Sequence, residues 1–344
     1  MSEMKKTLFE EIKNMPIKDF YACPDVKSKV LTNATDVIKT PEKDSLISLF
    51  DIDEKCDISS LSDFEYFRAF FELLPRFSGT KEADLANEEA YILQGKYPSL
   101  SSVEELWKSA RDLLSACDGD YETLLKTIGV EKLHRGYGED CSFVCVEKYN
   151  CGEETLIVTC DARSLPFVRP DPYHASLAEE KRGRGEPLSA EEKAILATQA
   201  LYLLCANKGD CKLDLHLLAD DEQTLLAWIS YLKRLNVQGH VWVAADGNID
   251  PDTLASLCAH SDDHLRIRLE IVLGKTDSAK NFEKRLSALS ALYPIALWRF
   301  GGVITRSPLF AAGHMLARRV ISDITSTLVS DYDDAVATVR SIFS

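Results

Sequence analysis

The chain has 344 residues, of which 45% are hydrophobic, and a formal net charge of −15. This length suffices for one large domain or two ordinary domains with a sizeable core. The acidity argues against nucleic acid and anionic lipid as partners, because a surface of this sign repels phosphate groups.

The ten cysteines stand singly in apolar stretches, as Cys205 and Cys258 do. Buried thiols in a chain of this size are typical of a reducing compartment. No apolar run approaches the roughly 20 residues of a membrane span, and no apolar signal core follows Lys5 and Lys6. We therefore expect a cytoplasmic protein that makes no membrane contact.

The first part of the chain is predicted to be mainly helical. A short helix over residues 8–14 precedes a strand over residues 16–24. From about residue 45 to residue 125, aromatic and leucine side chains recur at helical spacing. Phe64, Phe67 and Phe71 form one such stripe, which we expect to be core.

Strands and helices alternate after residue 130. Ser189 and Glu192 form a capping box that begins a helix over residues 190–207. Strands are expected at residues 130–134, 143–146, 156–161, 213–217, 240–245, 265–273 and 295–305. This alternation favours parallel βαβ units, and no GxGxxG or Walker A loop follows a strand, which disfavours a nucleotide-binding sheet.

The predicted fold class is therefore α/β, a (β/α) TIM-type barrel with a helical insertion after the first strand. We divide the chain into three regions. Residues 1–44 hold the N-terminal helix and the first barrel strand, residues 45–127 are the helical insertion, and residues 128–344 form the remainder of the barrel.

Four motifs carry a resemblance to a known family. The chain reads Asp19-Phe20-Tyr21-Ala22-Cys23, then Arg169-Pro170-Asp171, then Leu215-His216-Leu217, and finally Val303-Ile304-Thr305-Arg306-Ser307 followed by His314 and Arg318-Arg319. In this order and spacing they resemble the motifs of uronate (glucuronate) isomerases of the amidohydrolase superfamily. The resemblance covers most of the chain and implies a TIM barrel that interconverts D-glucuronate and D-fructuronate.

The departures from this family concern its divalent metal. Tyr21 and Cys23 stand where the family has two metal-binding histidines, and Ile304 stands where it has a metal-binding aspartate. An apolar side chain cannot ligate a cation, so we expect no metal and no other cofactor. The family's S-D-H-G strand also has no counterpart between Asp171 and Lys212, so we allow for a distorted barrel or a lost βα unit, with residues 143–146 as a substitute strand.

The candidate site residues lie at predicted strand ends, where barrels carry their function. Asp19, Tyr21 and His216 are the family-placed groups left to move protons. Each also has a plain structural interpretation, as a turn residue, barrel lining and a satisfied core histidine.

The substrate-binding candidates are Arg169, Arg306 and Asp171. A planar guanidinium group suits a carboxylate, because the two can pair through two hydrogen bonds. For both arginines, an internal salt bridge is the competing structural interpretation.

Three functional hypotheses follow. The first is an aldose–ketose isomerase that works without the usual metal, and the second is a catalytically impaired relative that keeps a pocket for a small anionic sugar, a hexuronate. The third is a different enzyme with Cys23 as its nucleophile, which we rank last because no partnering histidine can be assigned. We prefer the second, with no nucleic-acid or membrane partner, and leave homo-oligomerisation open.

Overall fold

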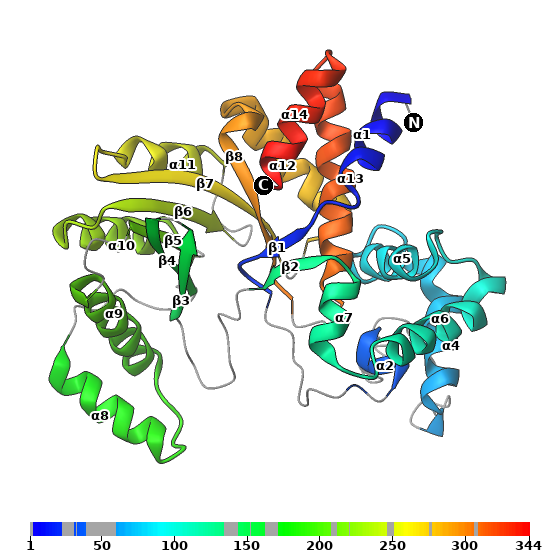
Figure 1. Ribbon diagram of the computed structural model, residues 1–344, viewed down its shortest axis with the longest axis horizontal. Helices are drawn as coiled ribbons and strands as arrows, with labels where there is room; N and C mark the ends of the chain where they lie inside the picture. Colours follow the sequence, from blue (N-terminus) through cyan, green and yellow to red (C-terminus); the bar gives the residue numbers. More distant parts are fainter. Residues whose placement is uncertain are drawn as a thin grey trace.

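The computed structural model describes residues 3–22, 31, 33–38, 60–133, 144–151, 153–161, 171–207, 212–219, 221–245, 251–274, 277–305 and 309–344. Within these residues, helices cover a curved sheet on one side of the molecule, and a group of helices from the N-terminal half stands beside it (Figure 1). No helix in these ranges is long and apolar enough to cross a membrane.

A six-stranded sheet organises the chain from residue 144 to residue 303. Its strands follow chain order, and every neighbouring pair is parallel except the first, β3 and β4. The strands are β3 (Val144–Cys151), β4 (Glu153–Asp161), β5 (Lys212–Ala219), β6 (Gly239–Ala245), β7 (Leu265–Leu273) and β8 (Trp298–Val303). The prediction of an α/β protein with parallel strands is confirmed, and residues 144–146 of the expected strand belong to the antiparallel strand β3.

Helices connect the parallel strands and close the chain. They are α8 (Pro172–Gly183), α9 (Ala190–Asn207), α10 (Glu222–Arg234), α11 (Pro251–Leu257), α12 (Ala279–Leu292), α13 (Ala311–Leu328) and α14 (Tyr332–Ile342). The predicted capping box begins α9, because the Glu192 carboxylate accepts from the Ser189 amide at 2.7 Å and Ser189 Oγ accepts from the Glu192 amide at 3.2 Å.

A second sheet extends this array. It pairs β1 (Ile17–Asp19) in parallel with β2 (Val130–Leu133). The Phe20 amide donates to the Gly301 carbonyl at 3.0 Å, which attaches the end of β1 to β8. The described strands therefore run in the order β2-β1-β8-β7-β6-β5-β4-β3, and among the residues that the structure describes no strand pairing joins β2 to β3.

The stretch that the sequence predicts to be helical contains α4 (Asp63–Leu73), α5 (Lys81–Gln94), α6 (Val103–Ala116) and α7 (Tyr121–Thr127). Phe67 and Phe71 are buried in its core, as the stripe predicts, and Trp107 of α6 packs against Phe67. Helix α5 also packs on α13, which joins this helical group to the part of the chain that carries the sheets. The division into three regions stays a prediction.

The outer face of the sheet packs on helices. Leu213, Leu215 and Leu217 of β5 alternate along the strand and are buried in the main core. Trp228 of α10 and Phe282 of α12 belong to the same core. The residues between these leucines, including His216, therefore point to the opposite face, which we call the inner face.

Candidate functional site

Four polar side chains meet on the inner face and form what we call the Glu270 cluster. Glu270 Oε2 accepts hydrogen bonds from the Tyr21 hydroxyl at 2.7 Å and from His216 Nδ1 at 2.8 Å. Glu270 Oε1 accepts from Arg299 Nε at 2.8 Å. The four residues come from β5, β7, β8 and the end of β1, so the cluster ties together strands that are distant in sequence.

The charge of Glu270 is held inside the protein. Its side chain and that of His216 are both 0% exposed. Burial by itself raises the pKa of Glu270, but attraction to His216 and Arg299, with hydrogen bonds from His216 and Tyr21, outweighs it and lowers the pKa to about 2. Glu270 is therefore ionised at neutral pH, and both of its oxygens accept hydrogen bonds from neighbouring side chains.

Aromatic rings enclose the cluster. Phe20 stacks on His216 with ring centroids 3.7 Å apart and planes 15° apart. The Arg299 guanidinium lies 3.4 Å from the centroid of the Trp242 ring, and the indole Nε1 of Trp242 donates to Asp214. These contacts hold Arg299 against β6, so its side chain is fixed by both charge and stacking.

Asp19 occupies a separate buried position. Its carboxylate accepts four hydrogen bonds, from the amides of Tyr21, Ala22 and Val303 and from His314 Nε2, at 2.6–2.9 Å. Burial lowers the pKa of His314, against the opposing effect of Asp19. A neutral His314 with its proton on Nε2 accounts for this contact, and Asp19 then joins β1, β8 and α13.

Two glycines make room for the buried carboxylates. A Cβ atom on Gly301 would lie 2.4 Å from the Glu270 side chain, and one on Gly302 would lie 2.4 Å from Asp19 Oδ1. Gly302 also has a φ of +143°, which an L side chain rarely adopts. The Gly301-Gly302 pair is therefore required for both acids to lie against β8.

The inner face becomes apolar toward the carboxyl ends of the strands. Phe20 and Ile304 pack there with Leu218, Ala244 and Val272 in one buried group, and Ile304 is 4% exposed. These side chains offer no metal ligand. The Tyr21 hydroxyl, at a position where the resemblance expects a ligand, is committed to Glu270. Tyr21 and Ile304 therefore do not fit the family's metal, and the described residues contain no group of three or more potential metal ligands.

The structure brings two of the three predicted proton-moving residues together. Tyr21 and His216 share Glu270 Oε2, whereas Asp19 bonds to His314 and backbone amides. Asp171 caps α8 through the amides of Tyr173 and His174. Arg169, Arg306 and Cys23 lie outside the described residues, so the assignment of site roles stays a prediction.

Glu270 and Arg299 were not predicted from the sequence. Each is a charged residue between two large apolar residues, Leu269 and Ile271 in one case and Trp298 and Phe300 in the other. Such a residue needs a buried partner, so two of them on neighbouring strands were a signal for an internal ion pair.

Solved structures share the fold of this chain. The crystal structure of a uronate isomerase from Thermotoga maritima matches 99% of this chain and 96% of its own, with a TM-score of 0.59 at 14% identity. This chain has the fold of a uronate isomerase. A glucuronate isomerase from Caulobacter crescentus gives a TM-score of 0.62 at 13% identity, over 99% of this chain and 92% of its own.

The resemblance inferred from the four motifs is thus confirmed at the level of the fold. No protein-family profile matches the chain, and no curated protein sequence matches it significantly. At 13–14% identity the likeness to the uronate isomerase structures concerns architecture and carries no catalytic residue across.

Proposed function

We propose that this chain is a uronate isomerase-like protein that has lost metal-dependent isomerisation and binds a small anionic sugar, a hexuronate. A closed (β/α) barrel of the amidohydrolase type is part of the proposal. The observation that carries it is the commitment of Tyr21 and His216 to Glu270, beneath an apolar layer that contains Ile304.

Isomerisation moves a proton between adjacent carbons, which requires a base and an acid within hydrogen-bond reach of the substrate. Tyr21 is 1% exposed and His216 is 0% exposed, and both already bond to Glu270. Asp19 accepts four hydrogen bonds and is 0% exposed. A substrate would have to displace buried, charge-assisted contacts to use any of them, which costs about 3–5 kcal/mol for a buried ion pair.

The binding part of the proposal rests on residues at the predicted strand ends. Arg169 and Arg306 match arginines of the family motifs and would converge on one mouth if the barrel is closed. A hexuronate carboxylate would neutralise the charge of these arginines, and each charge-assisted hydrogen bond is worth roughly 1.5–3 kcal/mol. Binding could therefore persist after catalysis is lost.

Two measurements on the purified protein test the proposal. A coupled assay with D-glucuronate and D-galacturonate, run with added Zn²⁺ or Mn²⁺ and with chelator, should show no turnover above buffer. Calorimetric titration with the same sugars should show saturable binding that weakens about tenfold or more in Arg169→Ala and Arg306→Ala. Arg340→Ala is the matched control, because Arg340 pairs with Glu11 on the surface and should leave binding unchanged.

The outcomes test the loss of catalysis and the binding of a hexuronate separately. Robust turnover that chelator does not affect would establish the metal-free isomerase and refute the loss of catalysis. Binding heat that is absent from the unmutated protein would remove the sugar pocket and leave only the structural scaffold.

A further inference from the structure

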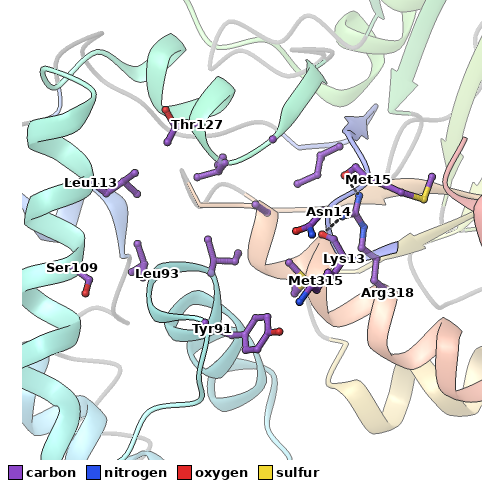
Figure 2. A pocket seen from close by; sticks show the side chains of 16 residues that line it. Lys13, Asn14, Met15, Tyr91, Leu93, Ser109, Leu113, Thr127, Met315 and Arg318 are labelled. Atoms are coloured by element: carbon purple, nitrogen blue, oxygen red, sulfur yellow. Dashed lines mark hydrogen bonds between the residues drawn. The ribbon is translucent and has the colours of Figure 1, made fainter. Parts of the chain in front are cut away.

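A cavity of about 480 Å³ lies between the helical group and the part of the chain that carries the sheets. It is lined by the end of α1 (Glu3–Ile12) and the segment that leads into β1, by α5 and α6, by the turn before β2 and by α13 (Figure 2). The starts of β1 and β2 border it, so it is at the opposite end of these strands from the predicted sugar mouth. Its volume is in the usual range for small-molecule sites.

One side of the cavity carries a positive charge that has no counterion among the described residues. Arg318 is 2% exposed, and its guanidinium donates to the carbonyls of Lys13, Met15 and Pro16 at 2.8–3.3 Å. No carboxylate pairs with it among the described residues, and its Nε has no hydrogen-bond partner there. Burial lowers the pKa of Arg318 to about 10, so it stays charged at neutral pH.

The next residue along α13 provides the contrast. Arg319 donates from Nε to Glu88 at 2.7 Å and lies over the rings of Phe9 and Tyr91. The charge of Arg319 is therefore balanced by the Glu88 carboxylate and by aromatic rings, as is usual for a buried cation. Arg318 has backbone carbonyls and the ring of Phe343, whose centroid lies 5.5 Å from the guanidinium, but no acid among the described residues. Lys13 beside it is paired with Glu10, so the cavity keeps about one positive charge without a counterion.

The other side of the cavity combines leucine side chains with Ser109 and Thr127, whose hydroxyl groups already donate to the Glu105 and Thr123 carbonyls of their own helices. Leu93 of α5 and Leu113 of α6 lie across the pocket from Arg318 in Figure 2. Ile128 and Met315 also line it and are partly exposed to it rather than sealed in the core. A ligand that filled this side would remove apolar surface from water, at about 25 cal/mol per Å².

We propose that this cavity binds a small amphipathic monoanion, a free carboxylate with an apolar tail of medium length. The carboxylate faces Arg318, and the tail lies along Leu93 and Leu113. A sugar acid does not suit it, because hydroxyl groups would be placed against leucine side chains. A dianion would exceed the single free charge. The site is thus separate from the hexuronate pocket.

Octanoate is the probe for this proposal, with octan-1-ol as its neutral counterpart. Calorimetry or ligand-observed NMR on the full chain should show saturable octanoate binding, at least about tenfold tighter than binding of octan-1-ol. Leu113→Trp, which fills the apolar side from the surface helix α6, should abolish it. Leu292→Trp is the matched control, because Leu292 is 52% exposed and does not line the cavity.

Arg318→Met should also weaken octanoate binding about tenfold or more, toward that of octan-1-ol. Because Arg318 joins α13 to the segment before β1, this variant is compared only if its circular dichroism spectrum is unchanged, and Leu113→Trp decides independently. No saturable octanoate binding to the unmutated protein, equal binding of octan-1-ol, or full binding by Leu113→Trp would each overturn the proposal. Hexuronate binding should be unaltered by Leu113→Trp. The test of the octanoate site is therefore independent of whether the hexuronate pocket exists.

Discussion

The Glu270 cluster and the Arg318 cavity are two buried polar regions with opposite electrostatic balance. In the cluster, Glu270 receives three hydrogen bonds, from Tyr21, His216 and Arg299. In the cavity, Arg318 has carbonyl partners but no acid among the described residues. A buried charge that is fully paired holds strands together, whereas one that lacks a counterion is open to a ligand. The difference assigns a structural role to the first region and a binding role to the second.

Removal of Glu270 should have the largest effect on stability. Glu270→Ala leaves Arg299, His216 and Tyr21 without their shared acceptor, so we expect a loss of about 3–5 kcal/mol in the free energy of unfolding. Urea unfolding followed by circular dichroism measures it. Glu283→Ala, at an exposed position on α12, is the control and should change stability little. Equal effects of the two substitutions would show that the cluster is not structural.

Substitution of Arg299 and Arg318 compares the two buried regions directly. Arg299→Met removes the guanidinium partner of the fully buried Glu270, and should cost about 2–4 kcal/mol. Arg318→Met removes a charge that has no counterion, and so leaves no buried carboxylate without its partner. We therefore expect a smaller loss in the free energy of unfolding, about 1–2 kcal/mol. Urea midpoints and slopes of the two variants provide the test. If Arg318→Met were the more costly, the assignment of roles to the two regions would be reversed.

The glycine pair offers a test of the close packing on β8. Gly302→Ala places a methyl group 2.4 Å from Asp19 Oδ1 at a φ of +143°, and we expect a loss of about 2 kcal/mol or more. Gly183→Ala is matched in chemistry but meets nothing within 4 Å, so its melting temperature should stay close to that of the unmutated protein. A Gly302→Ala protein as stable as Gly183→Ala would mean that Asp19 is not held as described.

Acidification should weaken the fold in two stages. The lowered pKa of His314 means that the unfolded chain binds this proton more readily, so stability falls as the pH drops below about 6.5, at roughly 1 kcal/mol or more per pH unit. The lowered pKa of Glu270 gives the same sign, because its contribution is present above pH 4.5 and is lost as the pH falls toward about 2. Unfolding titrations at pH 7, 5 and 3 measure both stages. Constant stability from pH 7 to pH 5 would contradict the buried, neutral His314.

Local patterns predicted much of this fold. The alternation of apolar residues placed β7 at residues 265–273 and showed that His216 lies in an apolar strand, because both properties depend on neighbouring residues. The contact between Glu270 and Arg299 depends on the register of β7 against β8, which is irregular between Ile271 and Val272 and is invisible in either strand alone. The motifs led to Tyr21 and His216, but not to the acid that unites them.

The Arg318 cavity could not be predicted from the sequence, for a related reason. The pair Arg318-Arg319 entered the sequence analysis only as part of a motif, and sequence spacing does not tell which arginine has an acid nearby. The difference arises because α5 brings Glu88 to Arg319, while the chain before β1 brings only carbonyl groups to Arg318. Tertiary contacts of this kind separate two adjacent, chemically identical residues.

The central claim is that the Glu270 cluster holds strands together and moves no protons for a substrate. Deuterium wash-in tests it most directly, because it detects proton abstraction even when no product is released. The protein is incubated in D₂O with D-glucuronate or D-galacturonate, and deuterium at C2 of the sugar is followed by NMR. We predict no incorporation above the uncatalysed rate, with or without added Zn²⁺ or Mn²⁺. Incorporation at C2 that persists in chelator and disappears in Tyr21→Phe would contradict the account and make Tyr21 a catalytic residue.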